Sequence, residues 1–192
     1  MRIIVVGASG DIGRAACKEL EQRHEIVTVG RSTGDFQVDV GNLHAVKSLY
    51  EKVGTVDAVV SCAGDATFAP LSNMDQEMFM VGLRQKVMGQ VNLVLAGLNV
   101  ISDGGSFTLT SGVLDRDPIR MGSNAATANG ALAGFGQGFG KQIILTQAGV
   151  AVFFAALTAA SPMASRMAVV RPGAGASSIT FWWRRCSEQS RS

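Results

Sequence analysis

The chain has 192 residues, of which 47% are hydrophobic and 17% charged, so it is not a disordered polymer and is long enough for one domain with a single core. Its formal net charge of +2 hides a split, because residues 1–136 carry 11 basic and 14 acidic side chains, whereas residues 137–192 carry six basic side chains against Glu188 alone. Those six are sparse and do not cluster on an evident face, so they do not indicate a nucleic-acid partner.

Strands and helices alternate in the first part of the chain. Residues 2–7 form an apolar, branched run that is typical of a buried parallel strand. Residues 11–22 place apolar side chains on one face of a helix, and residues 25–30 and 36–40 predict two more strands. Residues 42–53 predict the second helix.

The alternation continues to about residue 135. Residues 57–64 predict a fourth strand, 75–99 a long helix, 105–111 a fifth strand, and another helix begins within 122–135. This order predicts an α/β fold, a Rossmann-type doubly wound parallel sheet with right-handed crossovers and helices on both faces. Ligands bind such sheets at the carboxyl ends of the strands. The sequence leaves the C-terminal strands of the sheet undefined.

Three glycines, Gly7, Gly10 and Gly13, stand between the first strand and the first helix. A tight turn, a close backbone approach to a pyrophosphate and close packing of the helix on the strand each require a glycine there. The helix N-terminus then presents free N–H groups and the positive end of its dipole to the phosphates. In this context the glycines predict dinucleotide binding rather than only a tight turn.

The end of the second strand predicts which dinucleotide binds. An acidic side chain there would bond the ribose 2′-hydroxyl of NAD(H) and repel a 2′-phosphate. Gly30 removes that acid, Arg31 offers a guanidinium suited to phosphate, and Ser9 in the glycine loop adds a hydroxyl. The sequence therefore favours NADP(H) over NAD(H), with a solvated surface arginine as the alternative for Arg31.

Seven short segments follow one another in the order and at the spacings of a known enzyme family. They are GASGDIG (7–13), GRS (30–32), VDV (38–40), SCAG (61–64), KVMG (86–89), TLTSG (108–112) and ALAGF (131–135). With them the chain resembles a short-chain dehydrogenase/reductase over about residues 1–135. The family transfers a hydride between a nicotinamide cofactor and a carbonyl/alcohol pair.

The resemblance implies a role at the cofactor for each matching residue. Asp39 and Val40 take the place of an Asp-Val pair beside the adenine. Cys62, Ala63 and Gly64 take the place of an Asn-Ala-Gly segment near the ribose, and we interpret Cys62 as a small packed residue because no activating base is visible. The implied cofactor-binding set is Gly7, Ser9, Gly10, Asp11, Ile12, Gly13, Arg31, Ser32, Asp39, Val40, Cys62, Ala63 and Gly64.

The resemblance also implies a catalytic set, which this chain matches only in part. The family uses a serine, a tyrosine and lysine in a Tyr-x-x-x-Lys motif, and an asparagine on the long helix. Ser111 matches the serine at the end of the fifth strand, with a turn hydroxyl as the alternative. In one register Ala125 replaces the tyrosine and Asn129 the lysine. In a register shifted by one residue, Asn124 and Ala128 take those places, so neither restores the pair.

Lys86 offers a compensation for the missing lysine. It stands three residues before a glycine, where the family has its helix asparagine, so Lys86 and Asn129 look like an exchange of the two groups. Its ammonium would then reach the nicotinamide ribose and is one candidate proton donor. The alternative is a lysine that points to solvent. Asp115 and Asp117 are weaker candidate acids, and Tyr50, the one tyrosine of the sequence, has no evident path to the site.

The C-terminal part departs from the family after about residue 136. We expect a dinucleotide-binding Rossmann domain at 1–140, followed at 141–192 by a divergent segment that is not a separate domain. With the charge split, this suggests a frame-shifted or otherwise foreign end that does not complete the sheet. Residues 149–157 fit a strand, and the uncharged stretch 143–160 fits, less well, a membrane helix near the minimum length.

The residues and the resemblance together predict an NADP(H)-dependent oxidoreductase of the short-chain type, acting on a carbonyl/alcohol pair and impaired by the missing tyrosine and lysine. The alternative is a non-catalytic dinucleotide-binding protein, such as a redox sensor or an interaction module. Three distant cysteines and two histidines form no metal-ligand set, and with no evident leader they suggest a reduced cytoplasmic setting. We expect a small-molecule carbonyl or alcohol as partner; the sequence defines neither the substrate nor whether the chain forms a homo-oligomer.

Overall fold

The computed structural model describes residues 1–139 and 143–147. One parallel sheet has the strand order β3-β2-β1-β4-β5-β6. Its strands are β1 (Arg2–Val6), β2 (Glu25–Gly30), β3 (Phe36–Gln37), β4 (Val56–Ser61), β5 (Ile101–Ser111) and β6 (Ile143–Gln147). Because the order reverses between β1 and β4, the predicted doubly wound Rossmann-type sheet is confirmed.

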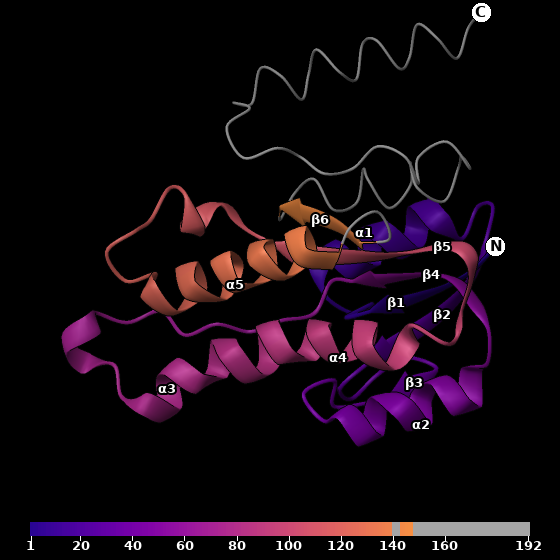
Figure 1. Ribbon diagram of the computed structural model, residues 1–192, viewed down its shortest axis with the longest axis horizontal. Coiled ribbons are helices and arrows are strands. Elements are labelled where there is room, and N and C mark those ends of the chain that lie inside the picture. Colours follow the sequence, from indigo (N-terminus) through magenta and orange to yellow (C-terminus); the bar gives the residue numbers. More distant parts are fainter. Residues whose placement is uncertain (140–142, 148–192) are drawn as a thin grey trace, which may run out of the picture.

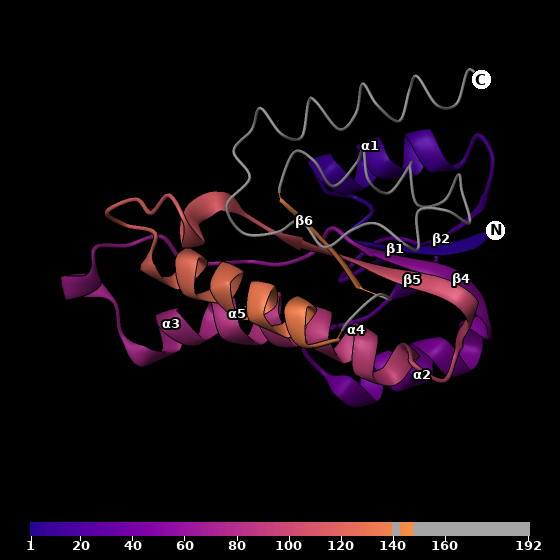
Figure 2. The same cartoon turned by 45° about the horizontal axis from the view of Figure 1, so that its top comes forward.

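Helices cover both faces of this sheet (Figures 1 and 2). In Figure 2, α1 lies on one face, and α2, α4 and α5 lie on the other. The helical segments are α1 (Asp11–Leu20), α2 (Leu43–Val53), η1 (Leu71–Asn73), α3 (Gln76–Val81), η2 (Gly82–Met88), α4 (Gly89–Gly97), η3 (Val113–Asp115) and α5 (Ser123–Phe139). The predicted elements are present, with ends that differ by a few residues from the sequence-based ranges.

The alternation of side chains along β1 divides the core between the two faces. Ile4 and Val6 are buried in the larger cluster, which also contains Leu93 of α4 and Leu132 of α5. Ile3 and Val5 point to the other face and pack in a smaller cluster with Leu20 of α1. Both faces of the strand are therefore apolar, as expected for a strand in the middle of a parallel sheet.

The long helix expected at 75–99 forms as three consecutive segments, α3, η2 and α4. Asp75 caps its start, since its carboxylate accepts a hydrogen bond from the Met78 N–H at 2.8 Å. The middle segment, η2, is π-helical, and it contains Lys86. Such widened turns disturb the regular helical spacing and are frequent at functional sites. The position of Lys86 therefore depends on a local widening that the sequence pattern does not predict.

The strand β6 corrects the expectation for the C-terminal segment. It pairs in parallel with β5, from Phe107 opposite Ile143 to Ser111 opposite Gln147. Residues 143–147 thus extend the sheet beyond position 140, and their apolar, branched sequence suits a parallel strand. They therefore form a strand and not the start of a membrane helix. The strand expected at 149–157 lies outside the described residues. The foreign origin of the segment stays a prediction. No helix among the described residues has the length and apolarity needed to cross a bilayer.

Candidate functional site

The glycine loop passes tightly over the neighbouring strand end. Gly7 adopts a φ of +78°, and its N–H donates to the carbonyl oxygen of Val29 at 2.7 Å. A Cβ on Gly7 would lie 2.8 Å from the Ala63 nitrogen, and a Cβ on Gly13 would overlap the carbonyl oxygen of Gly7. No larger residue fits at either position without moving backbone. The loop therefore has the compact shape that the glycine spacing predicts.

The N-terminus of α1 leaves its first N–H groups without a side-chain cap. Gly10 occupies the N-cap position and has no side chain to accept a hydrogen bond. The Asp11 carboxylate turns to Arg14, whose guanidinium also donates to the Ser9 carbonyl at 2.7 Å. Ser9 is exposed and Ile12 half-buried. The free N–H groups and the helix dipole make this terminus suited to an anionic group such as a pyrophosphate.

Arg31 lies at the carboxyl end of β2 and is held by two side chains from other parts of the chain. Its guanidinium donates to Gln85 Oε1 of η2 at 2.5 Å and lies 3.6 Å from Asp65 Oδ2, in the loop after β4. All three positions lie at the carboxyl edge of the sheet. Ser32 is exposed beside Arg31. Sequence reasoning named Arg31 and Ser32 but missed Asp65 and Gln85, because neither belongs to a motif.

Asp39 and Val40 lie just beyond β3, in the turn that leads to α2. The predicted strand at 36–40 ends at Gln37, and the Asp39 carboxylate accepts from the Gly41 N–H at 3.0 Å. Val40 is buried, and its carbonyl accepts from the Asn92 side chain of α4 at 2.9 Å. Asp39 is exposed at the edge while Val40 anchors the turn to the core.

Cys62, Ala63 and Gly64 continue β4 into the loop beside the glycine loop. The Cys62 N–H donates to the Val6 carbonyl at 2.8 Å, which extends the pairing of β4 with β1. Burial, with a smaller effect of Cys17, raises the pKa of the Cys62 thiol to about 12. At neutral pH the side chain is therefore a protonated thiol, as the interpretation of a packed residue requires.

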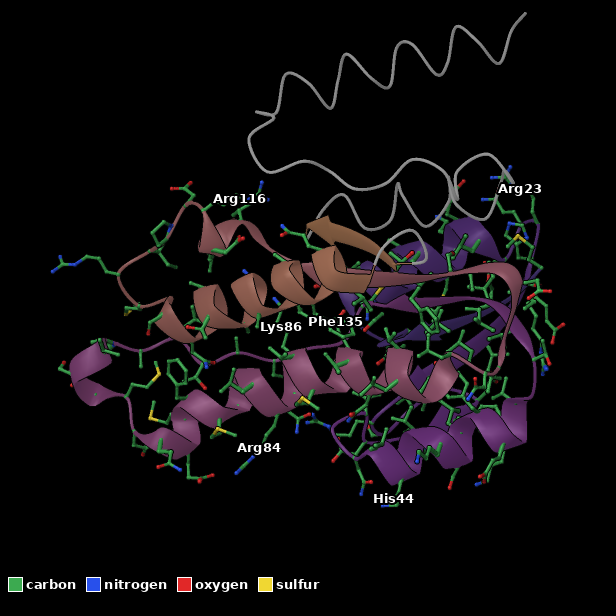
Figure 3. The ribbon with its side chains drawn as sticks, viewed as in Figure 1. Arg23, His44, Arg84, Lys86, Arg116 and Phe135 are labelled. Carbon is green, nitrogen blue, oxygen red and sulfur yellow. The ribbon has the colours of Figure 1, made fainter. Side chains whose placement is uncertain are left out.

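Lys86 crosses this loop. Gly64 has a φ of +150°, and a Cβ there would lie 2.8 Å from Lys86 Cγ, so the glycine makes room for the lysine stem. Figure 3 places Lys86 on the side of the long helix that faces α5. Burial lowers the pKa of Lys86, and within residues 1–139 and 143–147 its ammonium makes no hydrogen bond or ion pair. Lys86 is thus half-buried, in contrast to the alternative of a lysine directed wholly into solvent.

Ser111 and Asn129 meet at the end of β5. The Ser111 hydroxyl donates to the Asn129 carbonyl at 3.2 Å, and both residues are buried. A Cβ on Gly112 would lie 2.8 Å from Asn129 Nδ2, so the amide packs directly against the residue after Ser111. Asn129 Oδ1 is buried with no hydrogen-bond partner among the described atoms. One helical turn earlier, Ala125 presents only a methyl group, and it is buried as well.

Tyr50 lies in the core and not at this site. Its hydroxyl donates to the Leu93 carbonyl of α4 at 2.8 Å, and a Cβ on Gly97 would lie 2.7 Å from the same hydroxyl. Gly97 ends α4, whereas Lys86 precedes its start. Burial raises the pKa of Tyr50. Tyr50 therefore cannot take the place of the missing tyrosine.

Asn124 is a second buried amide that joins the elements around the site. Its Oδ1 accepts from the Thr67 N–H at 2.9 Å, and its Nδ2 donates to the Phe79 carbonyl. The amide also packs against Gly82, where a Cβ would lie 2.5 Å from Oδ1. Asn124 thus ties α5 to α3 and to the loop after β4. The sequence pointed to this residue only as a replacement for tyrosine, because its three partners are distant along the chain.

Two loops at the carboxyl edge of the sheet expose apolar side chains. The loop after β4 and the loop after β5 are joined by the hydrogen bond from the Ala69 N–H to the Met121 carbonyl at 3.2 Å. The exposed apolar residues of these loops are Phe68, Leu71, Val113, Ile119 and Met121. Asp115 lies among them with a mostly buried side chain, and its nearest cation is Arg116 at 3.9 Å.

These features fit a dinucleotide at the carboxyl edge of the sheet. The glycine loop has the close backbone approach, and the start of α1 has the open N–H groups, that a pyrophosphate needs. The Lys86 ammonium and Asn129 Oδ1 supply a donor and an acceptor that lack partners among the described residues. An unpaired buried acceptor such as Asn129 Oδ1 is costly, and with the half-buried ammonium of Lys86 it fits a ligand that carries hydroxyl groups.

Comparison with known proteins agrees with this arrangement. The model of the NAD dependent epimerase/dehydratase family matches residues 3–102. The protein lin1944 from Listeria innocua is 44% identical, with a TM-score of 0.71 over 76% of this chain and 74% of that chain. A small-chain dehydrogenase in complex with NADPH is 25% identical, with a TM-score of 0.68 over 73% of this chain and 64% of that chain.

A more distant solved structure shares the fold. A short-chain dehydrogenase/reductase from Vibrio parahaemolyticus is 17% identical, with a TM-score of 0.67 over 76% of this chain and 73% of that chain. No curated protein sequence matches the chain. The family match and the solved structures confirm the resemblance to the short-chain dehydrogenases/reductases that the motifs indicated.

Proposed function

The chain belongs to the NAD-dependent epimerase/dehydratase family, and on that premise we propose an NADP(H)-dependent oxidoreductase of the short-chain type that acts on a carbonyl/alcohol pair. A small-molecule carbonyl or alcohol is the partner, and the cytoplasm the setting, in this proposal. The bound nicotinamide supplies or accepts the hydride. The protein binds and orients both reactants and handles the proton at the reacting oxygen.

The observation that carries the cofactor assignment is the basic side chain at the end of β2. Arg31 stands there with its guanidinium at the sheet edge, and Gly30 excludes the acidic side chain that would select NAD(H). Gln85 positions the guanidinium through its amide oxygen without neutralising it. A guanidinium can bond two oxygens of a 2′-phosphate at once.

The exchanged groups Lys86 and Asn129 support binding of the nicotinamide ribose. Asn129 packs on Gly112 beside Ser111, and this contact favours the register in which Asn129, and not Ala128, replaces the family lysine. In this assignment the Lys86 ammonium donates to a ribose hydroxyl and Asn129 Oδ1 accepts from one. Ser111 releases its bond to the Asn129 carbonyl and donates to the reacting oxygen.

The proton at the reacting oxygen needs a donor other than tyrosine, since Ala125 stands in its place. Lys86 is the candidate, because its partial burial already lowers its pKa and so makes the ammonium a stronger acid. A positioned general acid contributes about 10²- to 10⁴-fold to such reactions. Because the tyrosine of the family is absent, we expect hydride transfer in this chain to be slower than in the family by up to this factor.

Titration with both cofactors tests the assignment. Arg31→Ala should weaken NADPH binding by about tenfold or more, since charge-assisted hydrogen bonds contribute about 1.5–3 kcal/mol, and leave NADH binding nearly unchanged. Arg23→Ala is the matched control, because Arg23 is exposed at the end of the molecule far from α3 (Figure 3). Equal losses for both cofactors in Arg31→Ala would contradict the assignment.

Ala125 also favours a second function, a non-catalytic dinucleotide-binding protein such as a redox sensor or interaction module. A buried methyl where the family has its acid removes the group that most directly serves catalysis. The two functions differ in turnover and not in binding. NADPH oxidation with a panel of aldehydes and ketones, measured from neutral to alkaline pH, separates them: turnover that falls in Ser111→Ala supports the oxidoreductase, and binding without any turnover supports the alternative.

A further inference from the structure

The Arg31 guanidinium is shared between a neutral and a charged partner. Gln85 accepts one of its hydrogen bonds, and the Asp65 carboxylate lies 3.6 Å away. The side chains of Arg31 and Asp65 are 63% and 67% exposed, so solvent screens the pair and its contribution to folding is small. The chain thus has an acidic side chain beside Arg31 that stability does not require.

Asp65 comes from a different strand end than Arg31. It directly follows Gly64, in the loop that begins beside the glycine loop, where Ala63 packs against Gly7. Lys86 crosses Gly64, and its neighbour Gln85 bonds Arg31, so η2 connects the same three positions. The carboxylate therefore stands at the cofactor edge of the sheet and faces the basic group expected to bind the 2′-phosphate.

We propose that Asp65 is a specificity-determining residue that competes with the 2′-phosphate of NADP(H) for Arg31 and so limits the preference for NADP(H) over NAD(H). The inference rests on the proposed cofactor site. A 2′-phosphate carries close to two negative charges, so at Arg31 it either displaces the Asp65 carboxylate or stays beside a like charge. NAD(H) has a neutral hydroxyl at that place and meets neither penalty.

The size of the effect follows from the exposure of the pair. Two like charges a few ångströms apart at a surface repel weakly in water, and salt screens them over about 8 Å at physiological ionic strength. Removing the carboxylate should tighten NADPH binding by about two- to fivefold at low salt, on the scale of exposed charge pairs. NADH binding should change by less than about twofold, and the gain for NADPH should shrink at high salt.

Calorimetry on Asp65→Asn tests the proposal. The probes are NADPH, NADH, adenosine 2′,5′-bisphosphate and AMP, each at low and high salt, and the matched control is Asp103→Asn. Asp103 is also an exposed carboxylate and lies near the start of β5, at the opposite edge of the sheet. Tighter binding of both 2′-phosphorylated probes in Asp65→Asn alone supports the competition. Unchanged or weaker binding of those probes overturns it, as does an equal gain for NADH and AMP.

The variant Arg31→Ala separates this proposal from the cofactor assignment. If Arg31→Ala loses NADPH affinity while Asp65→Asn has no effect, the cofactor assignment stands and the role of Asp65 is wrong. If Arg31→Ala binds NADPH as the parent does, both fail. In the double variant the gain from Asp65→Asn should become smaller, because the group for which the carboxylate competes is gone; a full gain there also overturns the competition.

Discussion

Replacing Lys86 by methionine separates the charge of this side chain from its packing. Methionine is unbranched and of similar length, so it keeps the contact of the stem with Gly64 and removes the ammonium. The ammonium has no acceptor within the described part of the chain, so Lys86→Met leaves no buried partner unpaired there. We therefore expect the variant to fold at least as stably as the parent.

The same replacement should weaken cofactor binding. If the ammonium bonds a ribose hydroxyl, its loss removes a hydrogen bond to a charged group, which contributes about 1.5–3 kcal/mol. At about 1.4 kcal/mol per factor of ten, the Kd for NADPH should rise by about 10- to 150-fold. The Kd for NADH should rise equally, because both cofactors have the same nicotinamide ribose. Fluorescence titration measures both, and Lys47→Met, at an exposed lysine of α2, serves as the matched control.

The stability of the parent adds a pH test for Lys86. Burial lowers its pKa below the usual value of 10.5, so between the two values the unfolded chain binds more protons than the folded chain. The free energy of unfolding of the parent should therefore rise with pH through this window, relative to Lys86→Met. The cost of the buried charge is fully present below the folded pKa and is gone above about 10.5. Urea denaturation of both proteins along a pH series measures the difference.

Two outcomes would refute the reasoning about Lys86. If Lys86→Met binds NADPH and NADH with the Kd values of the parent, the ammonium makes no bond to the cofactor. If the stability difference between the two proteins does not depend on pH, the ammonium is not desolvated. A loss confined to NADPH would instead place Lys86 near the 2′-phosphate, and the exchange with Asn129 would be wrong.

Two further predictions concern Tyr50, which lies outside the site, and Cys62, which lines the site as a packed residue. Tyr50→Phe should lower the free energy of unfolding by about 1–2 kcal/mol, because the buried Leu93 carbonyl loses its donor, and should leave cofactor binding unchanged; urea denaturation and NADPH titration together check this. Cys62 should be alkylated far more slowly at pH 8 than an ordinary cysteine, because raising a thiol pKa from 9.0 to about 12 lowers its thiolate fraction about a thousandfold. Peptide mass spectrometry after iodoacetamide treatment measures that rate, and labelling of Cys62 as fast as that of a model peptide thiol would contradict the packed interpretation.

Features that depend on neighbouring residues along the chain were predictable from the sequence. The alternation of apolar strands and amphipathic helices sets the parallel sheet, because each element must bury its own apolar face. The spacing of Gly7, Gly10 and Gly13 sets the loop, because the turn and the helix start lie within a few residues of each other. Arg31 and Ser111 follow from this order, since each stands where a strand ends.

The exchange of Lys86 and Asn129 could be inferred from the sequence, but the surroundings of the two side chains could not. They depend on contacts between distant segments: Lys86 with Gly64, and Asn129 with Ser111 and Gly112. The role of the two groups at the ribose stays a prediction. The π-helical turn of η2 moves Lys86 out of the regular helical spacing, so a count of 3.6 residues per turn does not predict which way it faces.

Asp65 and β6 are two further features that the sequence did not predict. Asp65 reaches Arg31 only because the loops after β2 and β4 end at the same edge of the sheet, and no local pattern marks it. The sequence analysis did not predict β6, because it judged the C-terminal segment by its charge, and charge is a property of composition. The pairing of β6 depends instead on the open edge of β5, which the apolar residues after α5 can cover. The sequence by itself determined which residues form strands, helices and the glycine loop. Only the tertiary structure decided which side chains from separate strand ends meet, because those contacts depend on strand order and not on spacing along the chain.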